Sequence, residues 1–164
     1  MDNNKDETYI DFGAGEIPLA AQLLAKGHPE ARVIAFERQF LRSPKQHNLL
    51  NVVSGDDLNI PLGSDSVDRI FATFIRAEMP DDRYIKLLQE FYRILKRNSK
   101  GYVLLCETQN SAPDIMQMAV NIGFVHYETY SGVFPPGSDW GETFAGASII
   151  NPRFTPTVVA FVKR

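Results

Sequence analysis

The feature that most constrains the fold is an alternation, along almost the whole chain, of short strand-like runs with segments of helical periodicity. Runs rich in β-branched and aromatic residues, such as Arg32–Glu37 and Val67–Ile75, are separated by segments whose apolar residues recur at helical spacing. This alternation is typical of a parallel β-sheet whose crossover connections are helices. We therefore expect an α/β protein.

The individual elements follow from the same patterns. The expected strands are Thr8–Phe12, Arg32–Glu37, Leu49–Val53, Val67–Ile75, Tyr102–Glu107, Phe124–Tyr130 and Thr157–Lys163. Apolar residues at helical spacing predict a first helix from Ile17 to a stop at Gly27, and Ala112–Ile122 predicts a later helix ending at Gly123. The strongest helical pattern is an apolar stripe from Tyr84 to Leu95, with Asp81 or Asp82 as its N-cap.

Length and composition bound the class of protein. The chain has 164 residues, of which 44% are hydrophobic and 23% charged, with a net charge of −3. These values predict one globular domain over residues 1–164, because the chain is too apolar for a disordered protein and has no apolar run of about 20 residues to cross a bilayer. The acidic, polar start does not resemble a secretory signal. We expect a cytoplasmic protein with no membrane association.

Two further classes of site are not favoured. The lone Cys106 cannot form an internal disulfide, and the sequence has no Cys/His spacing typical of a metal site, so we expect no metal. The slight negative charge does not favour a nucleic-acid partner. Three basic residues, Arg93, Lys96 and Arg97, are interpreted as a solvated helix end, where the helix dipole favours cations.

A long loop is expected at about 131–155, between the last two strands. It contains several glycines and prolines and is too long for a tight hairpin. It is either a surface insertion or a lid, and the second reading is supported by Phe134, Trp140 and Phe144, which are unfavourable in water.

The first strand–turn–helix unit carries most information about function. Gly13 and Gly15 stand between the strand and the helix, where glycine allows close backbone approach to a ligand. Asp11 ends the strand, and Glu37 ends the next strand about 20 residues after the turn, a spacing typical of a carboxylate that binds a ribose diol. Pro18 replaces the third glycine of the dinucleotide-binding pattern. The alternative is a tight turn without a ligand.

A second acidic group follows the third strand. Asp56 or its neighbour Asp57 could accept a hydrogen bond from an exocyclic amine such as that of adenine. Both could equally be ordinary turn residues.

Taken together, these segments resemble the class I methyltransferases that depend on S-adenosylmethionine. The resemblance rests on Asp11–Gly15, Glu37, Gly55–Leu62, Ser66–Phe71, Glu90–Lys96 and Asn121–Phe124, which follow in the family's order and spacing. It implies an open, doubly wound, three-layer α/β/α fold with a mostly parallel sheet of about seven strands, the last antiparallel. It also implies the cofactor S-adenosyl-L-methionine, with S-adenosyl-L-homocysteine as product.

The resemblance assigns roles around the turn. Gly13 and Gly15 would let the methionine part of the cofactor pass over the backbone. Asp11 would organise the loop and bind the amino group directly or through water, and Glu37 would hold the ribose hydroxyls.

It also assigns roles at the neighbouring strand ends. Asp56 would meet the adenine amine, while Asp57 and Leu58 would line the ring. Phe74, with Ile75 and Arg76, would lie near the sulfonium.

The methyl acceptor and any catalytic residue stay open. In-line methyl transfer mainly needs alignment of nucleophile, carbon and sulfur, and a base only when the acceptor arrives protonated. No residue is singled out as that base; Glu78 is more simply an exposed loop carboxylate. The sequence lacks the Asn/Asp-Pro-Pro-Tyr tetrad of nucleic-acid amino-methylating enzymes, so we expect a small-molecule or protein acceptor.

The sequence departs from the family in ways that suggest alternatives. Few residues precede Tyr9, where the family usually has helices that cover the cofactor. The loop at 131–155, a second copy in a homodimer or a partner subunit could supply that cover. The alternatives to a methyltransferase are a non-catalytic cofactor-binding or scaffold subunit of the same fold and a nicotinamide- or flavin-dependent oxidoreductase.

Overall fold

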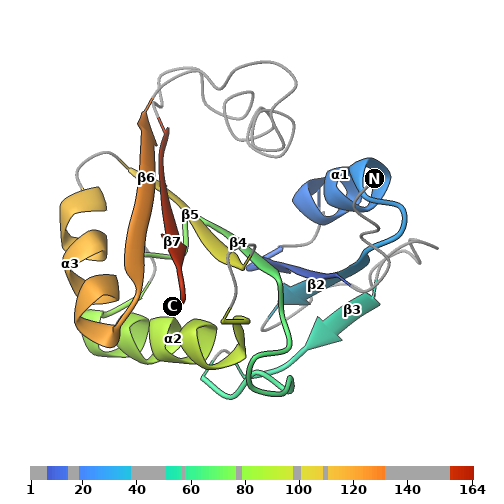
Figure 1. The fold of residues 1–164 in the computed structure, drawn as a ribbon, viewed down its shortest axis with the longest axis horizontal. Coiled ribbons are helices and arrows are strands. Elements are labelled where there is room, and N and C mark those ends of the chain that lie inside the picture. The colour runs from blue at the N-terminus through green and yellow to red at the C-terminus, as the bar shows by residue number, and fades with distance from the viewer. Residues whose placement is uncertain are drawn as a thin grey trace.

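The structure of the protein is a computed structural model. It describes residues 7–14, 19–37, 51–56, 58–76, 79–97, 101–108, 111–131 and 156–164. Its elements, shown in Figure 1, are β1 (Thr8–Phe12), α1 (Leu19–Gly27), β2 (Arg32–Glu37), β3 (Asn51–Ser54), β4 (Arg69–Thr73), α2 (Asp81–Ile94), β5 (Tyr102–Thr108), α3 (Ala112–Ile122), β6 (Val125–Ser131) and β7 (Pro156–Val162).

The strands form one seven-stranded sheet in the order β3-β2-β1-β4-β5-β7-β6. Every pairing among β1 to β5 is parallel, whereas β7 runs antiparallel to both β5 and β6. The order reverses beside β1, where an open parallel sheet leaves a crevice outside the carboxyl ends of its strands. The predicted mostly parallel sheet with an antiparallel last strand is confirmed.

Helices cover both faces of the sheet (Figure 1). Alternation along β1 sends Ile10 and Phe12 into a core packed by α2 and α3, while Tyr9 enters a second core with Ala21 and Leu24 of α1. The two cores lie on opposite faces, which confirms the three-layer arrangement.

Strand β4 is shorter than the sequence predicts. The expected strand was Val67–Ile75, but the sheet pairing covers Arg69–Thr73. Val67 instead forms an isolated bridge with Leu95, and Phe74 has a left-handed backbone with φ 56°, which turns the chain out of the sheet. Apolar residues continue past the C-terminal end of the strand, at Phe74 and Ile75, so composition alone could not locate that end.

The beginning of α2 also differs from expectation. The predicted N-cap at Asp81 or Asp82 is wrong, because Pro80 occupies that position without a side-chain cap. Asp81 lies in the first helical turn, where its carboxylate pairs with the guanidinium of Arg76. A carboxylate there still interacts favourably with the helix dipole.

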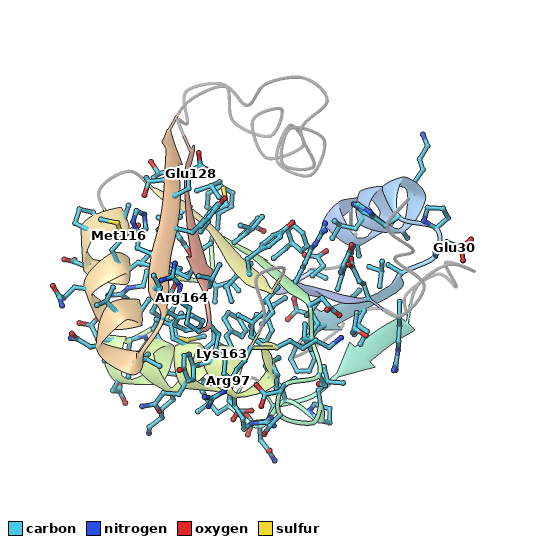
Figure 2. The ribbon with its side chains drawn as sticks, in the orientation of Figure 1. Glu30, Arg97, Met116, Glu128, Lys163 and Arg164 are labelled. Atoms are coloured by element: carbon cyan, nitrogen blue, oxygen red, sulfur yellow. The ribbon has the colours of Figure 1, made fainter. Side chains whose placement is uncertain are left out.

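Of the three basic residues expected at a solvated helix end, Arg93 in the last turn of α2 and Lys96 after it are half-buried and paired, whereas Arg97 is largely exposed, as expected. Arg93 donates to the carbonyl oxygens of Leu62 and Ile60 at 2.8 and 2.9 Å. Lys96 pairs with the buried Asp68 at 2.8 Å. Arg97 and Lys163, which Figure 2 shows near each other below the sheet, both reach Asp65.

The loop expected at 131–155 lies, except for its first residue, outside the described residues. Among the helices that the structure describes, none has the length and apolar character that a membrane span requires.

Two glycines at helix ends provide a matched test of backbone strain. Gly123 caps α3 at φ 116°, and a Cβ there would lie 3.2 Å from the Tyr92 hydroxyl oxygen. Gly27 ends α1 with open space around it. We expect Gly123→Ala to lower the free energy of unfolding by about 1–2 kcal/mol, and Gly27→Ala to leave it unchanged or raise it by up to about 1 kcal/mol. Urea unfolding measures both, and equal effects of the two substitutions would contradict the assigned backbone geometry.

Candidate functional site

The sheet register brings the ends of β1, β2, β3 and β4 to one rim. Phe12 pairs with Phe36 of β2 and with Ala72 of β4, so the turn after β1 lies between the ends of both neighbours. Glu37 is the last residue of β2 and pairs with Ser54 at the end of β3. The sequence-predicted residues at these strand ends therefore share one edge of the sheet.

The turn after β1 requires glycine at its first position. Gly13 has φ 72°, and the N–H groups of Gly13 and Ala14 donate to the carbonyl oxygen of Phe36 at 2.9 and 3.1 Å. A Cβ on Gly13 would lie 3.3 Å from Cδ1 of Ile75. The turn is thus held against β2 on one side and against the segment after β4 on the other. Gly15 lies outside the described residues.

Asp11 lies beneath this turn and is only 2% exposed. Its Oδ2 accepts a hydrogen bond of 2.9 Å from the backbone N–H of Ala21 in the first turn of α1. Burial raises the pKa of the Asp11 carboxyl to about 7, the Ala21 hydrogen bond opposes this rise, and the negative charge of Glu37 adds to it. Asp11 therefore fixes α1 to the strand end and lies close enough to Glu37 for their charges to interact.

Asp56 and Leu58 follow β3 in a local turn. The exposed Asp56 accepts from the N–H of Leu58 at 3.0 Å through Oδ1, and from the N–H of Asn59 at 3.1 Å through its carbonyl. Leu58 is half-buried and packs against the core on the α2 side. The turn-residue reading of Asp56 is therefore correct as local structure, and its exposed carboxylate still stands at the same rim as Glu37. Asp57 lies outside the described residues.

Phe74 lies directly after β4 and packs against the core on the α1 side of the sheet. Its N–H donates to the carbonyl of Cys106 at 2.9 Å, which extends the β4–β5 ladder by one bond before the left-handed φ turns the chain away. A phenylalanine with positive φ is uncommon and is held only where the surroundings enforce it.

Glu107 is a residue at this rim that sequence reasoning did not single out. It lies in β5, is 1% exposed, and its Oε1 accepts from the N–H of Arg76 at 2.8 Å. Burial raises the pKa of its carboxyl to about 7, although hydrogen bonds from the backbone of Arg76 and Ile75 and the charge of Arg76 oppose the rise. The available signal was an acidic residue ending an otherwise apolar run, which resembles a solvated strand end in the sequence.

The described part of the structure supports no catalytic or metal-binding role for the other candidate residues. Cys106 is buried, as expected for a small apolar residue, and burial raises the pKa of its thiol to about 12, so it stays protonated. Glu78 lies outside the described residues. Within the described ranges, no group of His, Cys, Asp and Glu side chains could hold a metal ion.

The rim can therefore bind a polar ligand along adjoining strand ends. The glycine turn allows close approach of a ligand to the backbone, while carboxylates at the ends of β2 and β3 can accept hydrogen bonds from hydroxyl or amino groups.

Comparison with known proteins gives matches in structure only. No protein-family model matches the sequence, and no curated protein matches it. The fold is similar to that of phosphoethanolamine N-methyltransferase 2 of Haemonchus contortus, in complex with phosphomonomethylethanolamine and S-adenosylhomocysteine, at a TM-score of 0.69 and 15% identity. This match covers 98% of the chain and 49% of that protein, so the chain spans about half its length.

Two other solved structures are equally similar. A methyltransferase of Haloferax volcanii, in complex with a methyltransferase activator, matches at a TM-score of 0.69 and 18% identity over 100% of this chain and 86% of that one. The [4+2]-cyclase SpnF matches at a TM-score of 0.69 and 12% identity over 98% and 75%. The chain thus has the fold of the class I S-adenosylmethionine-dependent methyltransferases, as the resemblance implied.

The two buried carboxyls predict how stability changes with pH. Because Asp11 has a folded pKa of about 7 against 3.8 as its ordinary value, the unfolded chain loses this proton first, and the free energy of unfolding falls as pH rises from about 4 to 7. Glu107 acts in the same direction, from an ordinary value of 4.5. We expect urea unfolding to show wild-type stability lower at pH 8 than at pH 5, with Asp11→Asn removing about 1–3 kcal/mol of that difference. Asp114→Asn, an exposed carboxylate on α3, is the control and should retain the full difference; an unaltered difference in Asp11→Asn would contradict the assignment.

Proposed function

We propose that the protein is an S-adenosyl-L-methionine-dependent methyltransferase. The observation that carries this proposal is the rim itself: a glycine turn after β1, a carboxylate at the end of β2 and another after β3 follow one another along adjoining strand ends. The fold is that of enzymes that use this cofactor, and two of its neighbours are methyltransferases.

The chain's own residues fit the parts of the cofactor. Gly13 has no side chain of its own, so the backbone of the turn can approach a ligand closely, and the methionine part would lie there. Glu37 would accept hydrogen bonds from the ribose hydroxyls, and Asp56 from the adenine amine. In this proposal Gly15 completes the turn and Asp57 lines the ring beside Leu58.

The chemistry asked of the protein is chiefly alignment. When bound, the cofactor supplies an activated methyl group, so the rim has to hold its donor carbon in line with a nucleophile and exclude water, which can be worth about 7–11 kcal/mol. Phe74, Ile75 and Arg76 would form the wall on the side of the sulfonium. The acceptor in this proposal is a small molecule or a protein side chain.

A form of the proposal in which a partner completes the site is supported by one neighbour. The Haloferax volcanii methyltransferase is in complex with an activator protein. A partner subunit, a second copy of the chain or the loop at 131–155 would cover the rim. In that case the chain alone would bind cofactor and transfer methyl groups only when covered, or would serve as a non-catalytic cofactor-binding subunit.

Competition between two ligands separates the methyltransferase from the oxidoreductase alternative. We expect S-adenosylhomocysteine to bind with a measurable heat in calorimetry and NAD not to displace it, because Pro18 replaces the third glycine of the dinucleotide-binding pattern. Tight NAD binding without a response to S-adenosylhomocysteine would instead support the oxidoreductase.

Glu37 gives the most direct test of the proposed site. We expect Glu37→Ala to weaken the binding of S-adenosylhomocysteine by about 1–3 kcal/mol, the range for loss of a hydrogen bond to a charged group. This corresponds to about a 5- to 150-fold rise in Kd, measured by calorimetry. Gly13→Val should abolish binding, but the strain at φ 72° also predicts loss of stability, so Glu37 is the cleaner probe.

The matched control is Glu30→Ala. Glu30 is an exposed carboxylate in the turn between α1 and β2, and Figure 2 shows it at the periphery of the molecule. Its removal changes the net charge equally and should leave Kd within about twofold of wild type, because solvent screens an exposed charge. If both variants bind S-adenosylhomocysteine as the wild type does, Glu37 does not hold the ribose.

A further inference from the structure

Glu107 has a buried carboxyl group that takes no part in the proposed cofactor contacts. It belongs to β5, and Cys106 pairs with Thr73 at the last step of the β4–β5 ladder, so Glu107 stands level with the exit of β4. Its side chain lies on the face covered by α2 and α3, since Val103 and Leu105 of the same strand pack there. It is therefore next to the rim, on the face of the sheet that α2 and α3 cover.

The carboxyl group is held in one orientation by the backbone of the β4 exit. Oε1 accepts from the N–H of Arg76 at 2.8 Å, and the backbone of Ile75 also hydrogen-bonds to the carboxyl. Oε2 is buried and has no hydrogen-bond partner in the structure. A buried carboxylate with one unsatisfied oxygen is costly, and such a group in a native protein calls for an explanation.

The charged and titratable groups around Glu107 do not neutralise it. The guanidinium of Arg76 is engaged elsewhere, by the carbonyl of Met79 at 2.8 Å and by the carboxylate of Asp81. Tyr84 of α2 has a buried hydroxyl that also lacks a hydrogen-bond partner, and the Glu107 charge adds to burial in raising the pKa of that hydroxyl. The other neighbours of Glu107 are Cys106 on the same strand and the uncharged Thr157 of β7, which pairs with Glu107.

One residue separates this carboxyl from the glycine turn. Ile75 hydrogen-bonds through its backbone to Glu107, and its side chain contacts the turn, since a Cβ on Gly13 would lie 3.3 Å from Cδ1 of Ile75. A ligand that lies over the turn is thus separated from Glu107 by one layer of protein. The electric field of a charge acts through such a layer, and it is screened less there than in bulk water because Ile75 is partly buried.

We propose that Glu107 is the buried counter-charge that makes this rim prefer the sulfonium form of the cofactor over its neutral thioether product. This inference rests on the proposed function. S-adenosylmethionine and S-adenosylhomocysteine share their ribose, adenine, ammonium and carboxylate groups and differ by one methyl group and one positive charge. The contacts of Glu37 and Asp56 serve both molecules equally, so discrimination needs a charge near the sulfur.

The acid–base behaviour of Glu107 makes the preference depend on pH. With a pKa of about 7, the carboxyl is mostly neutral at pH 5.5 and mostly charged at pH 8. The preference for the sulfonium should therefore grow as pH rises through 7. A cation above the rim also lowers this pKa, so binding of the sulfonium form near pH 7 should release a proton that binding of the thioether does not release.

The test compares the affinities of S-adenosylmethionine and S-adenosylhomocysteine by calorimetry at pH 8. Glu107→Gln keeps an oxygen that accepts from the Arg76 N–H and removes the charge. We expect it to weaken the binding of S-adenosylmethionine by about tenfold, which corresponds to about 1.4 kcal/mol. Binding of S-adenosylhomocysteine should change by less than about threefold, so the ratio of the two affinities falls.

Two controls make the result specific. Asp82→Asn removes an exposed carboxylate from the first turn of α2 and should leave the ratio within about twofold. Glu107→Asp keeps the charge and should keep most of the ratio. In wild-type protein at pH 7, calorimetry in two buffers of different ionisation enthalpy should show proton release with S-adenosylmethionine in excess of that with S-adenosylhomocysteine, which needs no variant to fold.

The outcomes separate this inference from the proposed function. If both ligands bind and Glu107→Gln leaves the ratio of affinities and the excess proton release unchanged, the counter-charge role is wrong while the cofactor assignment stands. If neither ligand binds the wild-type protein, the proposed function is wrong, and this inference is wrong with it.

Discussion

The parallel pairing of β1 with β2 and β4 is the constraint on which the candidate site depends. It sets Phe12 opposite both Phe36 and Ala72, so the chain leaving β1 must turn between two neighbouring strand ends. The carbonyl of Phe36 takes the N–H groups of Gly13 and Ala14, and Ile75 closes the other side. With the Phe36 carbonyl on one side, the Ile75 side chain on the other and φ at 72°, Gly13 has a backbone conformation that glycine adopts most readily.

Much of this arrangement could be predicted from the sequence because it is encoded locally. Alternating strands and helices, the glycines after β1 and the acidic residues after β2 and β3 are each visible within a few residues, and they gave the fold and most of the rim. What could not be predicted depends on tertiary packing. Phe74 leaves the sheet with a positive φ, and Arg93 donates to two carbonyls 31 and 33 residues earlier in the chain; neither feature has a local signature.

The same distinction explains why Asp11 was expected and Glu107 was not. Asp11 precedes a glycine turn, a local pattern that marks a strand end near a ligand. Glu107 matters because the Arg76 N–H, from a segment 31 residues earlier in the chain, meets its carboxyl oxygen, and because α2 and α3 bury it. Both carboxyls nevertheless share one physical consequence, since burial raises each pKa to about 7. Two groups whose charge changes near neutrality therefore lie next to the rim, Asp11 on the α1 side of the sheet and Glu107 on the side of α2 and α3.

A rim of this kind suits a reaction in which the ligand loses a positive charge. Contacts with the ribose and adenine would bind S-adenosylmethionine and S-adenosylhomocysteine equally well. Such uniform binding does not accelerate the chemical step. Only a group whose charge acts on the sulfur distinguishes the two forms of the cofactor, and in our proposal the buried carboxylate of Glu107 does so without touching the ligand. The fold itself does not dictate the reaction, since a [4+2]-cyclase shares it. The reaction therefore has to be argued from the groups at the rim, and in our proposal Glu107 is one of them.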